Sequence, residues 1–182
     1  MKKIIVFMIV FLAFSFNASA QVEIGLHGAY TFGGDIEKSD IGYGGQVLIR
    51  ATENIAFEIS VTKFSDGVET VTMDVIHAAG TVLFYIPMNE NTRLYGGVGV
   101  SRNSFDAKIA VPNFYATVDD NIGFHAALGM ETNLSDRVKL FGEVRHTWSS
   151  TTAEIKGPCG CEDDVTANFD FLFVGFGLRF SL

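Results

Sequence analysis

Apolar and polar residues alternate along the final stretch of the chain, residues 169–182, which has the sequence FDFLFVGFGLRFSL. Every second position from Leu172 to Leu182 carries an apolar side chain, and the positions between them are small or polar from Gly175 onward. A repeat of two matches a β-strand, in which successive side chains point to opposite faces. The stretch therefore predicts a strand with one apolar face and one mixed face.

Seven earlier segments show the same alternation. They are residues 22–32, 41–50, 55–62, 74–86, 93–101, 122–131 and 138–148. We expect each of the eight to cross a bilayer as a tilted strand, which takes about 9 to 11 residues. The sequence thus predicts an all-β fold, an eight-stranded antiparallel up-and-down transmembrane β-barrel.

The connections between these segments alternate in length. Residues 52–54, 87–91 and 133–137 form short turns, whereas residues 33–40, 65–72, 103–120 and 149–167 form longer polar loops. Short periplasmic turns and long extracellular loops are typical of outer-membrane barrels. Within the third loop, residues 107–111 and 114–118 keep a β-type composition, so we expect a protruding hairpin with edges suited to strand addition.

The direction of the mixed face separates a membrane barrel from a lipocalin-like ligand binder, which is also an eight-stranded barrel but has an apolar interior. The mixed face is rich in Gly and Ala, and the apolar face has almost no charge across its middle, as lipid contact requires. The acids and bases of the mixed face also balance in number, as buried charges must. These are Glu23, Glu58, Asp74, Glu131 and Glu143 against Arg50, Arg93, Lys139, Arg145 and Arg179. The mixed face is therefore expected to line the lumen.

Residues 1–20 carry the features of a secretory signal peptide. Lys2 and Lys3 precede an apolar run, and Ala18-Ser19-Ala20 forms a small-residue cleavage site. Residues 21–182 are then the barrel domain, and we expect no further domain after it. Removing two of the 13 basic residues leaves 11 against 21 acids, a net charge of −10. An acidic chain without a basic cluster argues against nucleic-acid binding.

Aromatic side chains gather near both ends of the apolar face, as in the aromatic girdles of outer-membrane barrels. Those near the loop ends are Tyr30, Phe32, Tyr43, Phe124 and Trp148, and those near the turn ends are Phe57 and Phe84.

The last strand resembles the C-terminal assembly signal of outer-membrane barrels at Gly177, Phe180 and Leu182. With residues 95–100 (YGGVGV) and 140–145 (LFGEVR), the chain resembles the small eight-stranded porin-like barrels, close to outer-membrane protein X and the barrel domain of outer-membrane protein A. The resemblance implies a monomer in the outer membrane of a Gram-negative-type cell. Its expected contacts are outer-membrane lipid, lipopolysaccharide and, during insertion, the barrel-assembly machinery. It implies no cofactor.

Charged residues of the lumen form the first candidate site. They are Arg50, Glu58, Glu131, Lys139, Glu143, Arg145 and Arg179. A salt-bridged plug is the favoured interpretation because eight strands leave room only for packed side chains, and a selectivity or gating cluster is the alternative. His27, His77 and His125 also point inward, and we favour hydrogen-bonded lumen histidines over a metal site there.

His146 points outward near a loop, with Ser150 and Asp170 on the same face. Such a set resembles lipid A deacylases, but Trp148 stands where that family has its serine. Cys159 and Cys161 lie in the last loop, where an exported protein favours a disulfide. A bond between chains and two free thiols stay open.

We therefore expect a non-enzymatic barrel with a plugged polar lumen, acting through extracellular loops in surface binding, adhesion or envelope integrity. A lipid-modifying enzyme and a small-solute channel are the alternatives.

Overall fold

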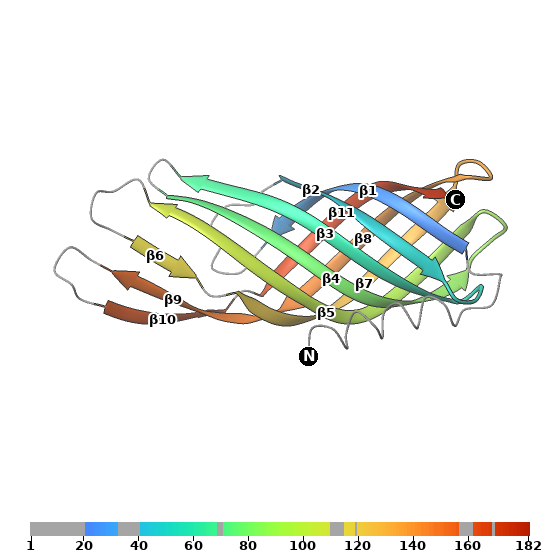
Figure 1. Cartoon of the computed structure of the whole chain (residues 1–182). Coiled ribbons are helices and arrows are strands. Elements are labelled where there is room, and N and C mark those ends of the chain that lie inside the picture. Colours follow the sequence, from blue (N-terminus) through green and yellow to red (C-terminus); the bar gives the residue numbers. More distant parts are fainter. Residues whose placement is uncertain are drawn as a thin grey trace.

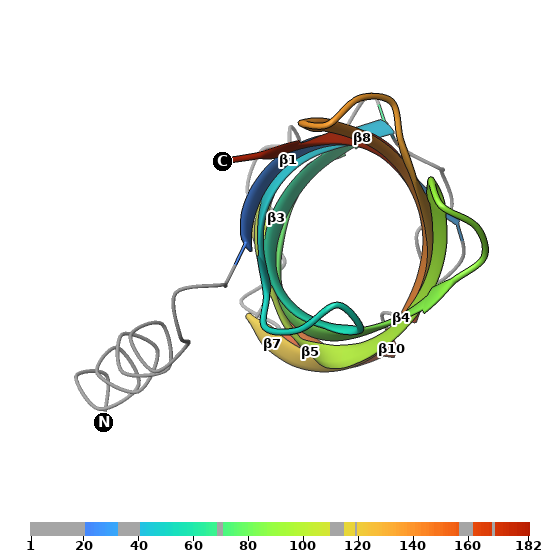
Figure 2. The ribbon, with the colours of Figure 1, turned by 90° about the vertical axis from the view of Figure 1, so that its right-hand side faces the viewer.

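The computed structural model describes residues 21–32, 41–68, 71–109, 115–118, 120–156, 162–168 and 170–182. Its strands are β1 (Gln21–Phe32), β2 (Ile41–Arg50), β3 (Ile55–Val68), β4 (Val71–Pro87), β5 (Thr92–Ile109), β6 (Tyr115–Val118), β7 (Asn121–Asn133), β8 (Val138–Trp148), β9 (Ser150–Lys156), β10 (Glu162–Asn168) and β11 (Phe171–Ser181). Eight of them close into an antiparallel barrel in the order β1-β11-β8-β7-β5-β4-β3-β2 (Figure 1). Figure 2 shows this closed ring end-on. The predicted eight-stranded barrel is confirmed, and no helix in these residues is long and apolar enough to cross a membrane.

The offset between neighbouring strands determines which residues meet inside the barrel. Starting from Val22, the successive cross-strand partners are Ile49, Phe57, Val82, Val98, Ala126, His146, Leu172 and Phe32. The path returns to β1 at Phe32, ten residues after Val22. Eight strands enclose an interior just wide enough to be filled by side chains. Residues from strands far apart in the sequence therefore meet in the lumen.

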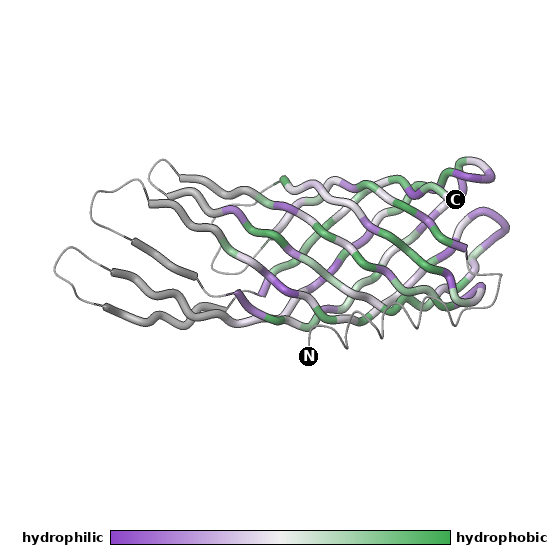
Figure 3. Tube along the Cα trace, viewed as in Figure 1, coloured by the Kyte–Doolittle hydropathy of each residue, from purple (hydrophilic) through white to green (hydrophobic). Residues whose placement is uncertain are grey.

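Alternate side chains point into the lumen and out of the barrel, as the sequence predicts. On β1, the residues from Glu23 to Thr31 alternate strictly between buried and exposed. On β8, from Val138 to Trp148, buried residues alternate with exposed or half-buried ones. Figure 3 shows it as green and purple positions that alternate along the strands. The exposed set is apolar, and all seven predicted girdle aromatics belong to it.

Three short turns at one end of the barrel share one hydrogen-bonding plan. In each, a backbone N–H donates to the carbonyl four residues later, at 3.0 Å for Ala51, 3.0 Å for Met88 and 2.9 Å for Leu134. The next residue, Thr52, Asn89 or Ser135, accepts backbone N–H groups through its side-chain oxygen. Short polar side chains favour such local turns because they bond to nearby backbone. These turns hold the ends of neighbouring strands in register.

The strands at the opposite end are longer than the sequence suggested. Residues 65–72 were expected to form a loop, but β3 and β4 continue through most of it and pair as far as Val68 and Val71. β5 likewise continues to Ile109, paired with β4. The expected loop rested on the side-chain pattern, whereas the strands are held by backbone hydrogen bonds between β3, β4 and β5. Such backbone pairing does not require alternating apolar and polar side chains.

The expected hairpin between residues 107–111 and 114–118 is wrong in its pairing. β6 is a strand, but it pairs with β9 rather than with β5. β9 also pairs with β10, so these strands form a separate sheet in the order β10-β9-β6. Residues 110–114, where the turn of that hairpin was expected, lie outside the described part of the chain. The composition of residues 114–118 predicted the strand, but nothing local in the sequence indicated a partner 35 to 41 residues away.

Candidate functional site

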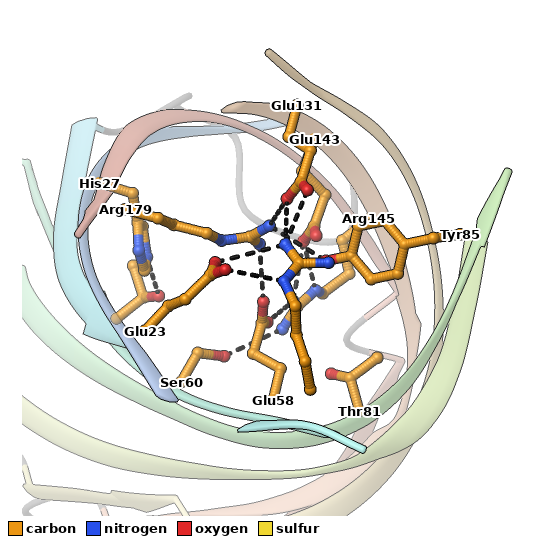
Figure 4. Close-up of polar contacts among 12 residues, drawn as sticks. Glu23, His27, Glu58, Ser60, Thr81, Tyr85, Glu131, Glu143, Arg145 and Arg179 are labelled. Carbon is orange, nitrogen blue, oxygen red and sulfur yellow. Dashed lines mark hydrogen bonds and ion pairs between the residues drawn. The ribbon is translucent and has the colours of Figure 1, made fainter. Parts of the chain in front are cut away.

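Arg179 lies at the centre of the lumen and binds acids from two other strands. Its Nη2 lies 2.9 Å from Glu58 Oε2, and its Nη1 lies 2.9 Å from Glu131 Oε2. The guanidinium also donates to the Tyr85 hydroxyl at 3.3 Å. Arg179 is on β11, Glu58 on β3 and Glu131 on β7, so these bonds span the interior (Figure 4).

A second group of charges continues from Glu131 toward the turn end of the barrel. Arg50 Nη2 lies 2.6 Å from Glu131 Oε1, and Arg50 Nε lies 2.7 Å from Glu23 Oε1. Glu23 also binds the Lys139 ammonium. Arg50 thereby joins β2 to β7, two strands on different sides of the ring.

A third group continues from Glu58 toward the extracellular side. Arg145 Nη2 lies 2.8 Å from Glu58 Oε1 and 2.7 Å from Glu143 Oε1. Its Nη1 donates to Ser60 Oγ at 3.2 Å.

The three groups form one unbranched chain of eight residues in which bases and acids alternate: Lys139, Glu23, Arg50, Glu131, Arg179, Glu58, Arg145 and Glu143. We call it the lumen charge chain. Four positive and four negative side chains leave it neutral, as charges held in a low dielectric require. All eight side chains are buried.

Aromatic rings separate the charge chain from the rest of the interior. The Arg179 guanidinium carbon lies 4.2 Å from the centroid of Phe141 and 5.3 Å from that of Tyr95. Arg50 lies 4.5 Å from the Tyr85 ring. Such cation–π contacts strengthen when water is excluded, so the rings both stabilise the cations and fill the space between them.

The cavity beside Glu143 and Arg145, at one end of the lumen charge chain, is about the size of one water molecule. It has a volume of about 10 Å³, and its lining includes His27, Ser60, Glu143, Arg145 and Phe173. The lumen at this level is therefore closed by side chains.

Each of the seven predicted lumen residues lies inside the barrel and belongs to the lumen charge chain. Glu23 is the eighth member of the lumen charge chain. The sequence signal for it was its place on the mixed face of the first strand. Two other expected lumen charges are not part of the lumen charge chain. Asp74 pairs with Lys63 at 3.0 Å, and both side chains are partly exposed. Asp74 is two residues from Ile76 and so shares its outward face. Arg93 lies at the turn end, with Nη1 3.4 Å from the Glu53 carbonyl oxygen.

The three lumen histidines bond to neighbouring side chains. His27 Nε2 lies 2.8 Å from Thr62 Oγ1, His77 Nδ1 lies 2.7 Å from Asn103 Oδ1, and His125 Nε2 lies 2.9 Å from Thr81 Oγ1. The rings of His77 and His125 are neighbours, with centroids 6.4 Å apart. Among the described side chains, no group of three or more His, Cys, Asp and Glu residues could hold a metal ion.

His146 faces outward, and its ring packs edge-on against Trp148 with centroids 4.5 Å apart. Asp170 Oδ1 accepts the Ser149 backbone N–H at 3.1 Å, which gives this acid a role in the local fold. Ser150 is exposed at the start of β9. Cys159 and Cys161 lie outside the described residues, so the predicted disulfide stays a prediction.

Gly177 of the expected assembly signal has a packing role in the folded barrel. It faces the interior, and a Cβ there would overlap the Leu26 carbonyl oxygen and lie 2.7 Å from the Phe141 ring. Phe180 and Leu182 face outward and are exposed. Their part in assembly stays a prediction.

Comparison with known structures places this fold among outer-membrane barrels. OprG from Pseudomonas aeruginosa superimposes with a TM-score of 0.74 at 18% identity, over 90% of this chain and 96% of that chain. AlkL, solved in DMPC bilayers, gives 0.67 at 15% identity over 90% of each chain. Outer membrane protein W of E. coli gives 0.61 at 15% identity, over 90% of this chain and 98% of that chain. At these identities the likeness concerns the fold alone.

Comparison with curated protein sequences gives no significant match. The family model described as "Outer membrane protein beta-barrel domain" matches residues 5–180, nearly the whole length of the sequence. That match agrees with the closed eight-stranded barrel, its apolar outer face and its charged interior. The chain therefore belongs to the family of outer membrane protein beta-barrel domains.

Proposed function

We propose that this protein is a non-enzymatic outer-membrane barrel that binds partners at the cell surface through its extracellular strands, while its lumen stays closed. The observation that carries the proposal is the separate sheet β10-β9-β6 beyond the barrel strands (Figure 1). In the described part of this sheet, β10 and β6 each pair only with β9. An edge strand offers backbone N–H and C=O groups to another chain, which is the basis of recognition by strand addition.

The closed lumen supports surface binding over transport. The lumen charge chain crosses the interior from β8 and β2 to β11 and β3, and its bonds would have to break to admit a solute. Because each acid is held by one or two bases, opening would expose several unpaired buried charges at once. We therefore expect no steady pore in the resting protein.

The test compares the mature protein with a variant in which a short Gly-Ser turn replaces residues 150–168. Cells displaying each protein are assayed for attachment to immobilised matrix proteins and polysaccharides, and the purified proteins are assayed for single-channel currents in planar bilayers. We expect attachment that requires residues 150–168, together with no steady current. Each protein must first show the heat-dependent gel mobility of a folded barrel. Steady, ion-selective current steps from the unaltered protein would favour the channel alternative.

The absence of enzymatic activity is part of the proposal and has its own test. The outward face near His146 supports it, since Trp148 occupies the place where lipid A deacylases have serine. Lipid A from cells that express the protein is examined by mass spectrometry. Loss of an acyl chain that disappears in His146→Ala would transfer the protein to the lipid-modifying enzymes.

A further inference from the structure

The turn end of the barrel contains a polar pocket that the closed lumen and the extracellular sheet do not explain. It has a volume of about 400 Å³, and its lining includes Gln21, Asn91, Arg93, Asn133, Asp136 and Lys139. These residues come from the start of β1, the start of β5 with the residue before it, the end of β7, the start of β8 and the turn between β7 and β8. This end faces the periplasm in the usual orientation of outer-membrane barrels.

Arg93 is the one base in this wall that no acid neutralises. Its cross-strand neighbour on β7 is Glu131. Both oxygens of Glu131 are already occupied, Oε1 by Arg50 at 2.6 Å and Oε2 by Arg179 at 2.9 Å. Among the described contacts, the Arg93 guanidinium makes only the long bond to the Glu53 carbonyl at 3.4 Å. Lys139, the other base in the wall, is bound to Glu23.

The remaining wall offers groups suited to a peptide. No described contact engages the side-chain amides of Gln21, Asn91 or Asn133, so their donors and acceptors are available to a ligand. A guanidinium binds a carboxylate through two parallel N–H bonds, which gives both affinity and orientation. The pocket volume lies at the lower end of the about 300 to 1,000 Å³ found for small-molecule sites, which fits a ligand of two or three residues.

We propose that this pocket binds the terminal carboxylate of a short peptide, with Arg93 as the anchor. The amides of Asn91 and Asn133 then bond to the peptide groups that precede the carboxylate. Two sources present this chemistry on the periplasmic side, the peptide stems of the cell wall and the C-termini of periplasmic proteins. They differ in the configuration of the last residues, which is D in many cell-wall stems and L in proteins.

Asp136 gives the proposal an internal check. It is the one acid in the wall, and no ion pair neutralises it among the described residues. Its charge opposes a carboxylate, so Asp136→Asn should strengthen binding severalfold while Arg93→Gln weakens it. A general loosening of the barrel would move both variants in the same direction.

The experiment titrates the full mature protein, folded in lipid nanodiscs, with N-acetyl-Ala-Ala in the L,L and D,D forms and follows amide and Arg side-chain NMR signals. The matching C-terminal amides serve as neutral controls, and inorganic phosphate serves as a simple anion. We expect the acids to shift the signals of Asn91, Arg93 and Asn133, and the neutral amides to bind at least tenfold more weakly. Preference for one configuration identifies the source.

Arg93→Gln should weaken binding of the acid at least tenfold, and Arg93→Lys should fall between it and the unaltered protein. Arg137→Gln is the matched control, because Arg137 lies at the same end of the barrel, in the turn between β7 and β8, but outside the pocket lining. The proposal is wrong if the acid and its neutral amide bind equally, if Arg93→Gln and Arg137→Gln behave alike, or if phosphate binds as well as the peptides.

Discussion

Arg179 and Glu58 face each other at the centre of the lumen, with Nη2 of the arginine 2.9 Å from Oε2 of the glutamate and both side chains fully buried. Arg179 is three residues before the last residue, Leu182, and Glu58 is on the third strand. Their bond therefore forms only when β11 has closed the ring against β1. The central ion pair of the lumen and the closure of the barrel depend on each other.

Removing Arg179 is predicted to give the largest loss of stability in the lumen. Arg179→Ala would leave Glu58 with Arg145 alone and Glu131 with Arg50 alone, and would open a void beside Phe141. Breaking a buried ion pair from one side costs about 3–5 kcal/mol. Urea unfolding of the protein refolded in lipid vesicles measures the change.

Arg102→Ala is the control for that measurement. Arg102 pairs with Asp120 at 2.6 Å, but the Arg102 side chain is 67% exposed. Exposed pairs contribute about 0–1 kcal/mol. Equal losses for the two variants would contradict the structural role of the lumen charge chain.

Glu143→Ala is predicted to loosen the lumen without creating a selective pore. Glu143 is the end of the charge chain, and its Oε2 has no hydrogen-bond partner. Arg145 also pairs with Glu58, 2.8 Å away in the unaltered protein, so the change is expected to destabilise less than Arg179→Ala. In planar bilayers we expect brief, irregular current fluctuations. Stable current levels with a fixed ion preference would instead mean that Glu143 closes an existing channel.

The sequence predicted the faces of the strands better than the contacts between them. A repeat of two assigns each residue to one side, and it placed Arg50, Glu131 and Arg179 in the lumen. Which of them meet depends on the ten-residue offset of the closed ring, and no local pattern shows that offset. Asp74 was misplaced because the residue types are reversed at this end of β4, where apolar Val75 takes the buried position and Asp74 the outward one.

The separate sheet β10-β9-β6 likewise shows that the sequence pattern predicts strands but not their long-range partners. The composition of residues 114–118 indicated a strand, but pairing with β9 joins Tyr115 to Lys156, which are far apart in the sequence. Long-range pairing depends on how neighbouring loops meet above the ring. The periplasmic pocket was missed for a related reason, since Gln21, Arg93 and Asp136 come together only in the closed barrel.

The two loop cysteines are predicted to form a disulfide with each other. Cys159 and Cys161 are separated by one glycine in an exported chain, where oxidation is favoured. The mature protein is treated with a thiol label, without reductant, and its intact mass is measured. We expect no label on the native protein and two labels after reduction. Two labels without reduction would refute the bond, and a dimer mass would indicate a bond between chains.

Arg102 is predicted to control the ionisation of Asp120 on the extracellular side. The Arg102 guanidinium, with Nη2 2.6 Å from Asp120 Oδ2, holds the pKa of that carboxyl below its ordinary value of 3.8. A lowered pKa in the folded state stabilises the fold above the ordinary value, and this contribution is lost as the pH falls through the folded value. Arg102→Gln should raise the pKa of Asp120, as followed by carboxyl carbon NMR. An unchanged pKa would show that other contacts of Asp120 lower it.

Gly99 and Gly80 lie on neighbouring strands and are predicted to respond differently to the same substitution. Gly99 faces the lumen, where an added Cβ would overlap the Gly80 carbonyl oxygen and lie 2.6 Å from His125 Nε2. The backbone oxygen cannot move without distorting the pairing of β4 and β5, and the imidazole is held by its bond to Thr81 at 2.9 Å. Gly80 faces outward, and a Cβ there would meet nothing within 4 Å.

Overpacking of a tight interior costs about 1–3 kcal/mol, whereas Gly→Ala at an unstrained strand position is neutral or mildly stabilising because the unfolded chain loses freedom. Gly99→Ala should therefore lower the urea midpoint of unfolding and change the His125 ring signals in NMR spectra. Gly80→Ala should leave both nearly unchanged. If Gly99→Ala were tolerated as well as Gly80→Ala, the lumen near His125 would have to contain more free space than the close approach of the imidazole to Gly99 allows.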